Sequence, residues 1–376
     1  MCDNDQTQSL LMTACKAGDI DCVKSLFKNN SISNYLFHNF SLLRSICIRG
    51  DNEMLKYILD RGLEIDDDLI LSCFTSEAIM SYNEIAQTLF EHILDVNFSD
   101  EAGDSFLRRA CKAGNVILAT KLLKKGADRY RVSPVYGDSL RAATLQGHVE
   151  VVKLLLSWDS QGNRIPSESL KEALNLASKH DHVAIVRSIV EYGVDAEDLA
   201  YALRLSVLRN RVEVAAYLII NGADINATFD NGSSIITLAC SFDYADMLQM
   251  LICRGADPNH VFASGSTLLL HVVQPKHRDQ SDSVETLTLL LGRGADPNLA
   301  HATTGKTPLM AAVFESLVSY VKLLLEHGAD VTQVNSEGKS VMDVLGQRRD
   351  NRYDEVIELC KEYIEINRPR VEPILK

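Results

Sequence analysis

Four Gly-Ala-Asp triplets, each preceded by a helix-like apolar run, limit what this chain can fold into. They stand at Gly222, Gly255, Gly294 and Gly328, with steps of 33, 39 and 34 residues between them, and an earlier copy begins at Gly126. A period of roughly 20 to 50 residues is typical of repeat proteins, in which each unit packs on its neighbours. The spacing therefore predicts a stack of short units rather than one globular enzyme.

The sequence around each triplet follows a constant pattern. In 305–312, Thr307 and Pro308 open a short apolar helix, and proline suits the first turn because the N–H that it lacks has no helical partner there. In 321–330 a second apolar helix ends at Gly328, since glycine readily adopts the left-handed conformation that a helix C-terminus needs. This pattern resembles the ankyrin repeat family, and related segments recur along nearly the whole chain.

The resemblance implies an all-α ankyrin-repeat solenoid of about ten to eleven helix–turn–helix units with short finger loops, curved with a concave binding face. We predict a single solenoid over residues 1–376. Its parts are degenerate N-terminal repeats over 8–102, more regular repeats over 103–337, a C-terminal capping repeat over 338–367 and a tail over 368–376. The capping assignment follows from the polar second helix of the last repeat, because a terminal unit exposes its outer side to water.

Composition and charge narrow the class of protein. A hydrophobic content of 46% suits units that bury their faces on one another. The nine cysteines contain no Cys-x-x-Cys spacing, so we interpret them as reduced core residues of an intracellular protein. The formal charge of −13 argues against nucleic-acid binding, which depends on basic surfaces. Because there is neither a signal-peptide pattern nor an apolar run of about 20 residues, we expect no membrane segment and a cytoplasmic location.

Two short motifs are compatible with a bound ligand but are better explained by the repeat. Residues 300–307 fit a relaxed phosphate-loop pattern, yet such a loop needs a strand before it and a long helix after it, and neither is predicted here. His180-Asp181-His182 stands in an interhelix turn and lacks further metal ligands at helical spacing. We therefore predict no cofactor and no metal. A cysteine–histidine enzyme assembled between distant repeats is the alternative of another class.

In ankyrin proteins the concave face, formed by the fingertips and the ends of the first helices, usually binds a partner protein. The two residues before each interhelix turn can be read from the sequence, and lysine or arginine recurs among them in the first seven units of this acidic chain. Basic side chains with aromatic neighbours favour an acidic peptide or protein surface; alternatively, these long side chains only solvate exposed helix ends. The predicted partner-binding residues are Lys16, Arg49, Phe74, Lys112, Gln146, Lys179, His180, Arg209, Phe242 and Phe314, with Phe229 and Lys306 on fingertips and Trp158 in a loop.

Irregular segments interrupt the repeat at three places. The links at 75–82 and 274–282 are longer than the pattern requires, and the loop that follows Trp158 replaces the expected Gly-Ala-Asp finger. Insertions in solenoids map to loops, where they either form binding surfaces or accumulate by neutral drift. Both interpretations are open for each of the three segments.

Modification of the fingers is a rival to plain binding. Asn226, Asn259 and Asn298 are similar to ankyrin asparagines that an oxygen-dependent dioxygenase hydroxylates in animal cells. They also fit the ordinary finger sequence, which needs no modification.

The leading interpretation is a non-enzymatic scaffold or adaptor that binds a partner protein and is monomeric. The alternative is a secreted bacterial effector that binds and redirects or inhibits a host protein in the host cell cytosol. Degenerate repeats and a C-terminal glutamate cluster resemble ankyrin effectors of type IV secretion systems; the glutamates are Glu355, Glu358, Glu362, Glu365 and Glu372. The polar capping helix explains the same glutamates.

Overall fold

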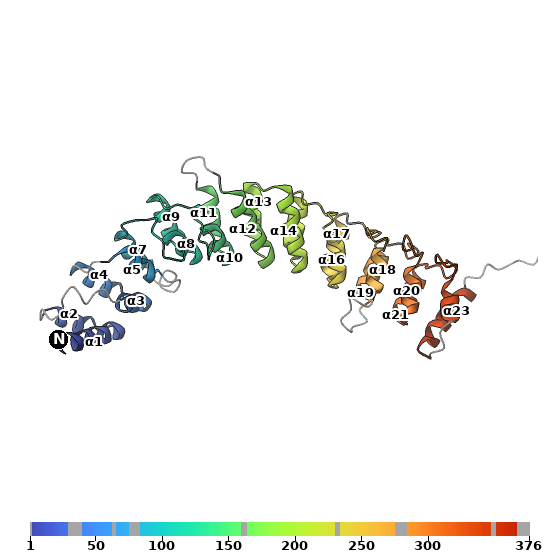
Figure 1. Ribbon diagram of the computed structural model, residues 1–376, viewed down its shortest axis with the longest axis horizontal. Coiled ribbons are helices and arrows are strands. Elements are labelled where there is room, and N and C mark those ends of the chain that lie inside the picture. The colour runs from blue at the N-terminus through green and yellow to red at the C-terminus, as the bar shows by residue number, and fades with distance from the viewer. Residues whose placement is uncertain are drawn as a thin grey trace, which may run out of the picture. The chain divides into compact units, whose positions relative to one another are not determined.

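The computed structural model describes residues 2–28, 40–61, 65–74, 83–158, 164–229, 234–274, 284–346 and 351–366. Contacts within the chain separate it into two compact units, Met1–Val194 (unit 1) and Asp195–Lys376 (unit 2). Each unit is a row of short helices arranged in helix–turn–helix pairs (Figure 1). The prediction of an all-α stack is confirmed, and within the described residues β structure is limited to isolated bridges in the fingers.

In the part of unit 1 that the structure describes there are six successive pairs, each with a first and a second helix. Their bounds are α1 (Cys2–Ala17) and α2 (Ile20–Lys28), α3 (Phe40–Arg49) and α4 (Asn52–Asp60), α5 (Asp67–Cys73) and α7 (Asn83–Glu91), α8 (Phe106–Lys112) and α9 (Val116–Lys124), α10 (Ser139–Leu145) and α11 (Val149–Ser157), and α12 (Ser167–His180) and α13 (Val183–Tyr192).

Unit 2 continues the same alternation. Its helices are α14 (Ala196–Leu208) and α15 (Val212–Ile220), α16 (Ile235–Ser241) and α17 (Ala245–Cys253), α18 (Leu268–Val273) and α19 (Glu285–Gly292), α20 (Pro308–Phe314) and α21 (Val318–Glu326), and α22 (Val341–Gly346) and α23 (Asp354–Ile366), the last preceded by the 3₁₀ turn η3 (Asn351–Tyr353).

Side-chain caps start several of the first helices. Ser105 accepts a hydrogen bond from the backbone N–H of Arg108 at 3.3 Å, and Thr307 accepts one from the N–H of Met310 at 3.1 Å. Such caps satisfy backbone donors that have no partner within the helix. Pro308 follows at the first position of α20, as the Thr-Pro pattern predicts.

The turn between the two helices of a pair requires a left-handed residue. Gly114 and Gly147 hold it with φ of 74° and 77°. At the same position other pairs use residues that tolerate this conformation through short polar side chains, namely Asp181, Asn210, Asp243 and Ser316, with φ between 53° and 66°. The turn geometry is therefore kept while its sequence varies.

Glycine also ends the second helices, as predicted from the triplets. Gly222, Gly255, Gly294 and Gly328 have φ between 85° and 99°, and no atom lies within 4 Å of where a Cβ would stand. Glycine is therefore used at these sites for its backbone conformation and not for a close approach.

The core runs between two layers of helices. Within each unit, first helices pack on neighbouring first helices, as α8 does on α10, and second helices pack on neighbouring second helices, as α9 does on α11. Apolar side chains from both layers fill the space between them; Phe106, Leu122 and Val152 are fully buried. Stability is thus built from contacts between neighbouring pairs, as expected for a stacked repeat.

Asparagines connect successive fingers. The side-chain amide of Asn298 donates to the Gly328 carbonyl at 3.0 Å and accepts from the Asp330 N–H at 2.7 Å. Asn259 makes the equivalent pair of bonds with the finger that follows it, to Gly294 and Asp296. These side chains therefore serve as structural bridges between repeats.

Some sequence predictions fall on residues beyond those described. They are the link at 75–82, all of the 274–282 insertion except Gln274, residues 159–163 of the loop after Trp158, and the tail from 368 onwards. Within the described residues, every helix falls short of the length and apolar character that a bilayer crossing requires.

Candidate functional site

Most of the predicted partner-binding residues in unit 1 lie at the C-terminal ends of first helices. We call six of them the unit 1 turn surface: Lys16, Arg49, Lys112, Gln146, Lys179 and His180. Lys179 is half-buried and the other five are exposed. Their shared position follows from the repeat, because the same helix end recurs in each pair.

Phe74 was predicted to belong to this set but does not reach the surface. Its side chain is only 1% exposed, and its ring packs edge-on against Phe106 at a centroid distance of 5.2 Å. It therefore belongs to the core between α5 and α8, and we leave it out of the proposed binding surface.

Arg49, although exposed, has a structural partner. Its guanidinium donates to the Lys16 carbonyl at 2.7 Å and covers Gly18, where a Cβ would clash with Arg49 Nη2. His148 makes the equivalent contact with the Lys112 carbonyl at 3.0 Å. A side chain at one interhelix turn thus bonds the turn of the preceding pair. Arg49, one of the predicted basic residues, therefore already helps to join two repeats.

His182 continues this series and gives the stability of unit 1 a pH dependence. Burial lowers the pKa of His182 below its ordinary value of 6.5, and the neighbouring His180, stacked on it at 6.1 Å, lowers it further. The unfolded chain therefore takes up this proton at a higher pH than the folded chain does. The stabilising contribution is complete above about pH 6.5 and is lost as the pH falls from there toward the lowered pKa.

As the pH falls from about 7.5 to about 5.5, we expect the melting temperature of His182→Gln to decrease less than that of the wild type. The comparison is of melting temperatures by circular dichroism, with the exposed His327→Gln as the matched control. A wild-type melting temperature that stays constant over this range, or a control that flattens the profile equally, would contradict the assignment.

The predicted residues of unit 2 are mainly aromatic. Arg209, Phe242 and Phe314 form the unit 2 turn surface, and the two phenylalanines are 50% and 45% exposed. Phe242 stacks on Tyr244 at 5.5 Å, and the Lys306 ammonium lies 5.1 Å from the Phe314 ring centroid. Exposed rings that are already held in place by neighbours provide contact area at little entropic cost.

The two remaining predicted residues are partly buried. Phe229 lies under the Arg204 guanidinium at 4.5 Å. Trp158 ends α11 as its C-cap residue, and its carbonyl accepts a hydrogen bond from Arg129. The Phe229 ring is thus covered by Arg204, whereas Trp158 is held through its backbone carbonyl.

Part of the positive charge near α8 is neutralised within the protein. Asp104 accepts hydrogen bonds from Arg108 and, at 2.9 Å, from Arg109 Nε, and Arg109 also pairs with Asp100 at 2.9 Å. The Arg108 guanidinium lies 4.6 Å from the Tyr136 ring centroid. Of the cations on this helix, Lys112 remains exposed at its end.

The finger that carries Tyr136 was not among the predicted residues. Val132 and Val135 are 62% and 65% exposed, and Tyr136 is 45% exposed. Ser133 fixes the loop by accepting from the N–H groups of Val135 and Tyr136 and donating to the Ala102 carbonyl. The sequence did contain a signal for this exposed apolar finger, because three large apolar residues stand in one short loop.

A serine–histidine contact bears on the enzyme alternative. Ser241 Oγ lies 2.8 Å from His271 Nε2, but the serine hydroxyl donates to the Thr237 carbonyl at 2.8 Å. Since a hydroxyl has one proton, the histidine is the donor in their contact. In a catalytic pair the serine hydroxyl would donate to the histidine base, so the hydrogen bond here runs in the opposite direction.

Several of the buried cysteines occupy a repeated position. Cys15, Cys111 and Cys240 each stand three residues before the left-handed turn residue of their pair. Burial raises the pKa of the Cys15 and Cys111 thiols to about 12 and also raises that of Cys240. Thiols with raised pKa are poor nucleophiles at neutral pH, so their role is in packing.

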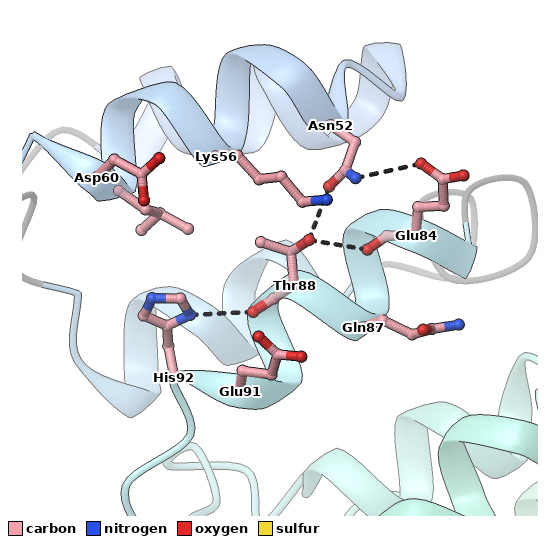
Figure 2. Close-up of a pocket in the computed structure, with 9 residues that line it drawn as sticks. Asn52, Lys56, Asp60, Glu84, Gln87, Thr88, Glu91 and His92 are labelled. Atoms are coloured by element: carbon pink, nitrogen blue, oxygen red, sulfur yellow. Dashed lines mark hydrogen bonds between the residues drawn. The ribbon is translucent and has the colours of Figure 1, made fainter.

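A polar cavity of about 430 Å³ lies between the second helices α4 and α7 (Figure 2). Its lining residues are Asn52, Lys56, Leu59 and Asp60 from α4, Glu84, Gln87, Thr88 and Glu91 from α7, and His92.

At one end of this cavity a hydrogen-bond network joins the two helices. Asn52 Nδ2 donates to Glu84 Oε2 at 3.2 Å, and Thr88 Oγ1 donates to Asn52 Oδ1 at 2.8 Å (Figure 2). Five other second helices begin with valine where α4 begins with Asn52; these are α9, α11, α13, α15 and α21. This substitution was the available sequence signal for the cavity, which we did not predict.

Comparison with known proteins agrees with this architecture. A family model described as ankyrin repeats (3 copies) matches residues 140–229, 174–262 and 269–370, which together make up more than half of the chain. Similar curated proteins include an ankyrin repeat and KH domain-containing protein of Caenorhabditis briggsae, which is 27% identical over 232 residues (57% of this chain and 8% of the relative).

Two further relatives carry the same repeat. The ankyrin repeat and KH domain-containing protein mask-1 of Caenorhabditis elegans is 24% identical over 260 residues, covering 65% of this chain and 10% of the relative. An ankyrin repeat protein of fowlpox virus is 27% identical over 157 residues, covering 40% and 36% of the two chains. The chain thus corresponds to only a part of each of these proteins.

The periodic helix pairs, their glycine-terminated second helices and the family match together lead to one conclusion: this chain belongs to the ankyrin repeat family.

Proposed function

We propose that this chain is a non-enzymatic scaffold or adaptor that captures an acidic surface of a partner protein on its turn surfaces. Ankyrin repeats are protein–protein interaction modules, and the side chains that such modules use stand at repeated helix ends. In this proposal the chain acts as a monomer, needs no cofactor and does not bind nucleic acid. The observation that carries the proposal is the exposure of several cations on the unit 1 turn surface of a chain whose formal charge is −13.

The charge and the fixed placement of these side chains both favour an acidic partner. Cations held at fixed spacing on a rigid stack raise the rate of encounter with an acidic partner and select against a basic one. The exposed rings Phe242 and Phe314 supply apolar contact area of the kind that dominates binding energy. Arg49 contributes less than the sequence pattern indicates, because its guanidinium already bonds the neighbouring turn.

The test compares two charge reversals within one helix pair. Lys112→Glu changes the unit 1 turn surface, whereas Lys124→Glu makes the same change at an exposed site on the second helix α9. Partners are captured from lysate, identified by mass spectrometry and then purified for affinity measurement. We expect Lys112→Glu to weaken the purified partner's binding about tenfold at physiological salt and Lys124→Glu to leave it nearly unchanged. Equal effects of the two variants would overturn the assignment of the turn surface.

A further inference from the structure

The side chains that line the cavity between α4 and α7 carry more negative than positive charge. Asp60, Glu84 and Glu91 contribute carboxylates, and Lys56 is the one cation among the lining side chains that is charged at all neutral pH values. His92 Nδ1 lies 3.0 Å from the Thr88 carbonyl, which can only accept, so Nδ1 carries the proton. In neutral His92 the other ring nitrogen, Nε2, is therefore a further acceptor.

At three other interfaces between second helices, the residue that directly follows the later helix is a cation that reaches the earlier helix pair. Lys125, which follows α9, reaches back to the preceding pair and donates to the Ile93 carbonyl at 2.6 Å while lying 5.3 Å from the Phe90 ring centroid. Arg254, which follows α17, donates to the Ala216 carbonyl on α15 at 2.7 Å. Arg293, which follows α19, reaches Cys253 Sγ on α17 at 2.8 Å. At these three interfaces a cation from one second helix thus contacts the second helix before it.

The interface between α4 and α7 lacks this arrangement, as does that between α19 and α21, where His327 bonds Leu323 of its own helix. The corresponding residue is His92, directly after α7, and its ring turns back onto its own helix by bonding Thr88. The C-terminal end of α4 has a negative helix dipole and the Asp60 carboxylate, and α7 contains no lysine or arginine that could reach it.

We propose that this cavity binds an arginine side chain presented by a basic segment of a partner protein. A guanidinium is positively charged and offers five N–H donors in one plane, which suits a site lined by three carboxylates and one lysine. Asp60 and Glu91 are placed to accept from it, and Leu59 provides an apolar contact for its methylene stem. The site differs from the turn surfaces in charge and in location, since it lies on second helices, and it stands whether or not the turn surfaces bind a partner.

The test uses three tripeptides of sequence acetyl-Gly-X-Gly-amide, in which X is arginine, lysine or citrulline. Citrulline keeps the shape of arginine but has no charge. Binding to the full chain is followed by NMR of the ring signals of its ten histidines, because His92 lines the cavity. We expect the arginine peptide to produce a saturable shift of His92, the lysine peptide to bind several-fold more weakly, and the citrulline peptide to cause no shift. A shift that is absent, or equal with citrulline, would overturn the proposal, and equal binding of lysine would overturn the choice of arginine.

Variants separate the cavity from the general negative charge of the chain. Asp60→Asn combined with Glu91→Gln removes two carboxylates from the cavity, and Asp21→Asn combined with Glu191→Gln removes two exposed carboxylates from second helices elsewhere in unit 1. We expect the first double variant to bind the arginine peptide about tenfold more weakly and the second to bind like the wild type. All four substitutions are at exposed positions and preserve size, so circular dichroism should show unchanged folding. Equal weakening by the two double variants would reduce the effect to net charge and overturn the assignment.

Discussion

Replacing Phe106 with alanine is expected to lower the free energy of unfolding by about 3–5 kcal/mol. The side chain is fully buried and joins two helix pairs, since its ring contacts Phe74 at 5.2 Å and Phe98 at 6.5 Å. Alanine would leave a cavity where α5 and α8 meet, and a stack that relies on contacts between neighbours has few other ways to hold this interface. The loss should therefore affect folding far more than any local function.

The measurement is urea-induced unfolding followed by circular dichroism, with hydrogen exchange to locate the weakened region. Phe314→Ala is the matched control, because it removes the same atoms from a ring that is 45% exposed. We expect the control to cost less than about 1 kcal/mol, as surface substitutions usually do. Faster exchange should concentrate in α5, α7, α8 and α9. A loss below about 1 kcal/mol for Phe106→Ala would show that this interface does not hold unit 1 together.

The second large effect is expected from Asp104→Asn, which keeps the shape of the side chain and removes its charge. Asp104 bonds both Arg108 and Arg109, and the side chains of Asp104 and Arg108 are 10% and 7% exposed. A buried cation that loses its carboxylate retains its desolvation cost without the compensating attraction, so we expect a loss of about 3–5 kcal/mol.

The exposed ion pair between Arg141 and Glu172 provides the comparison. Its side chains are 41% and 45% exposed, so Glu172→Gln should cost no more than about 1 kcal/mol. Both variants are compared by urea unfolding at low and high salt, where the exposed pair should be the more sensitive to salt. Similar losses for the two variants would mean that burial adds nothing to the Asp104 network.

The sequence was most informative where one backbone conformation recurs. Gly222, Gly255, Gly294 and Gly328 were predicted to end helices, and they do so because few other residues adopt their φ at low cost. Pro308 was likewise placed correctly at the start of α20, because its position depends on local chemistry alone. Local rules of this kind were sufficient to predict the helix pairs.

The prediction failed where a side chain's surroundings depend on another repeat. Phe74 was assigned to the surface from its place before an expected turn, but it ends α5 as the C-cap residue and turns inward against Phe106. Counting along one repeat could not reveal this contact, because Phe106 belongs to the next pair. The cavity between α4 and α7 was missed for the same reason, since its walls come from two pairs and only Asn52 marked it in the sequence.

The repeated placement of the buried thiols has a practical consequence. Cys15, Cys111 and Cys240 lie in different helix pairs, and each is shielded while its own pair is closed. A small alkylating reagent can therefore reach each sulfur only when that pair opens. The alkylation rate of each cysteine, measured by peptide mass spectrometry, then reports how often its pair opens. Comparing the three alkylation rates would show whether the stack opens from its ends or breaks in its interior, without any engineered label.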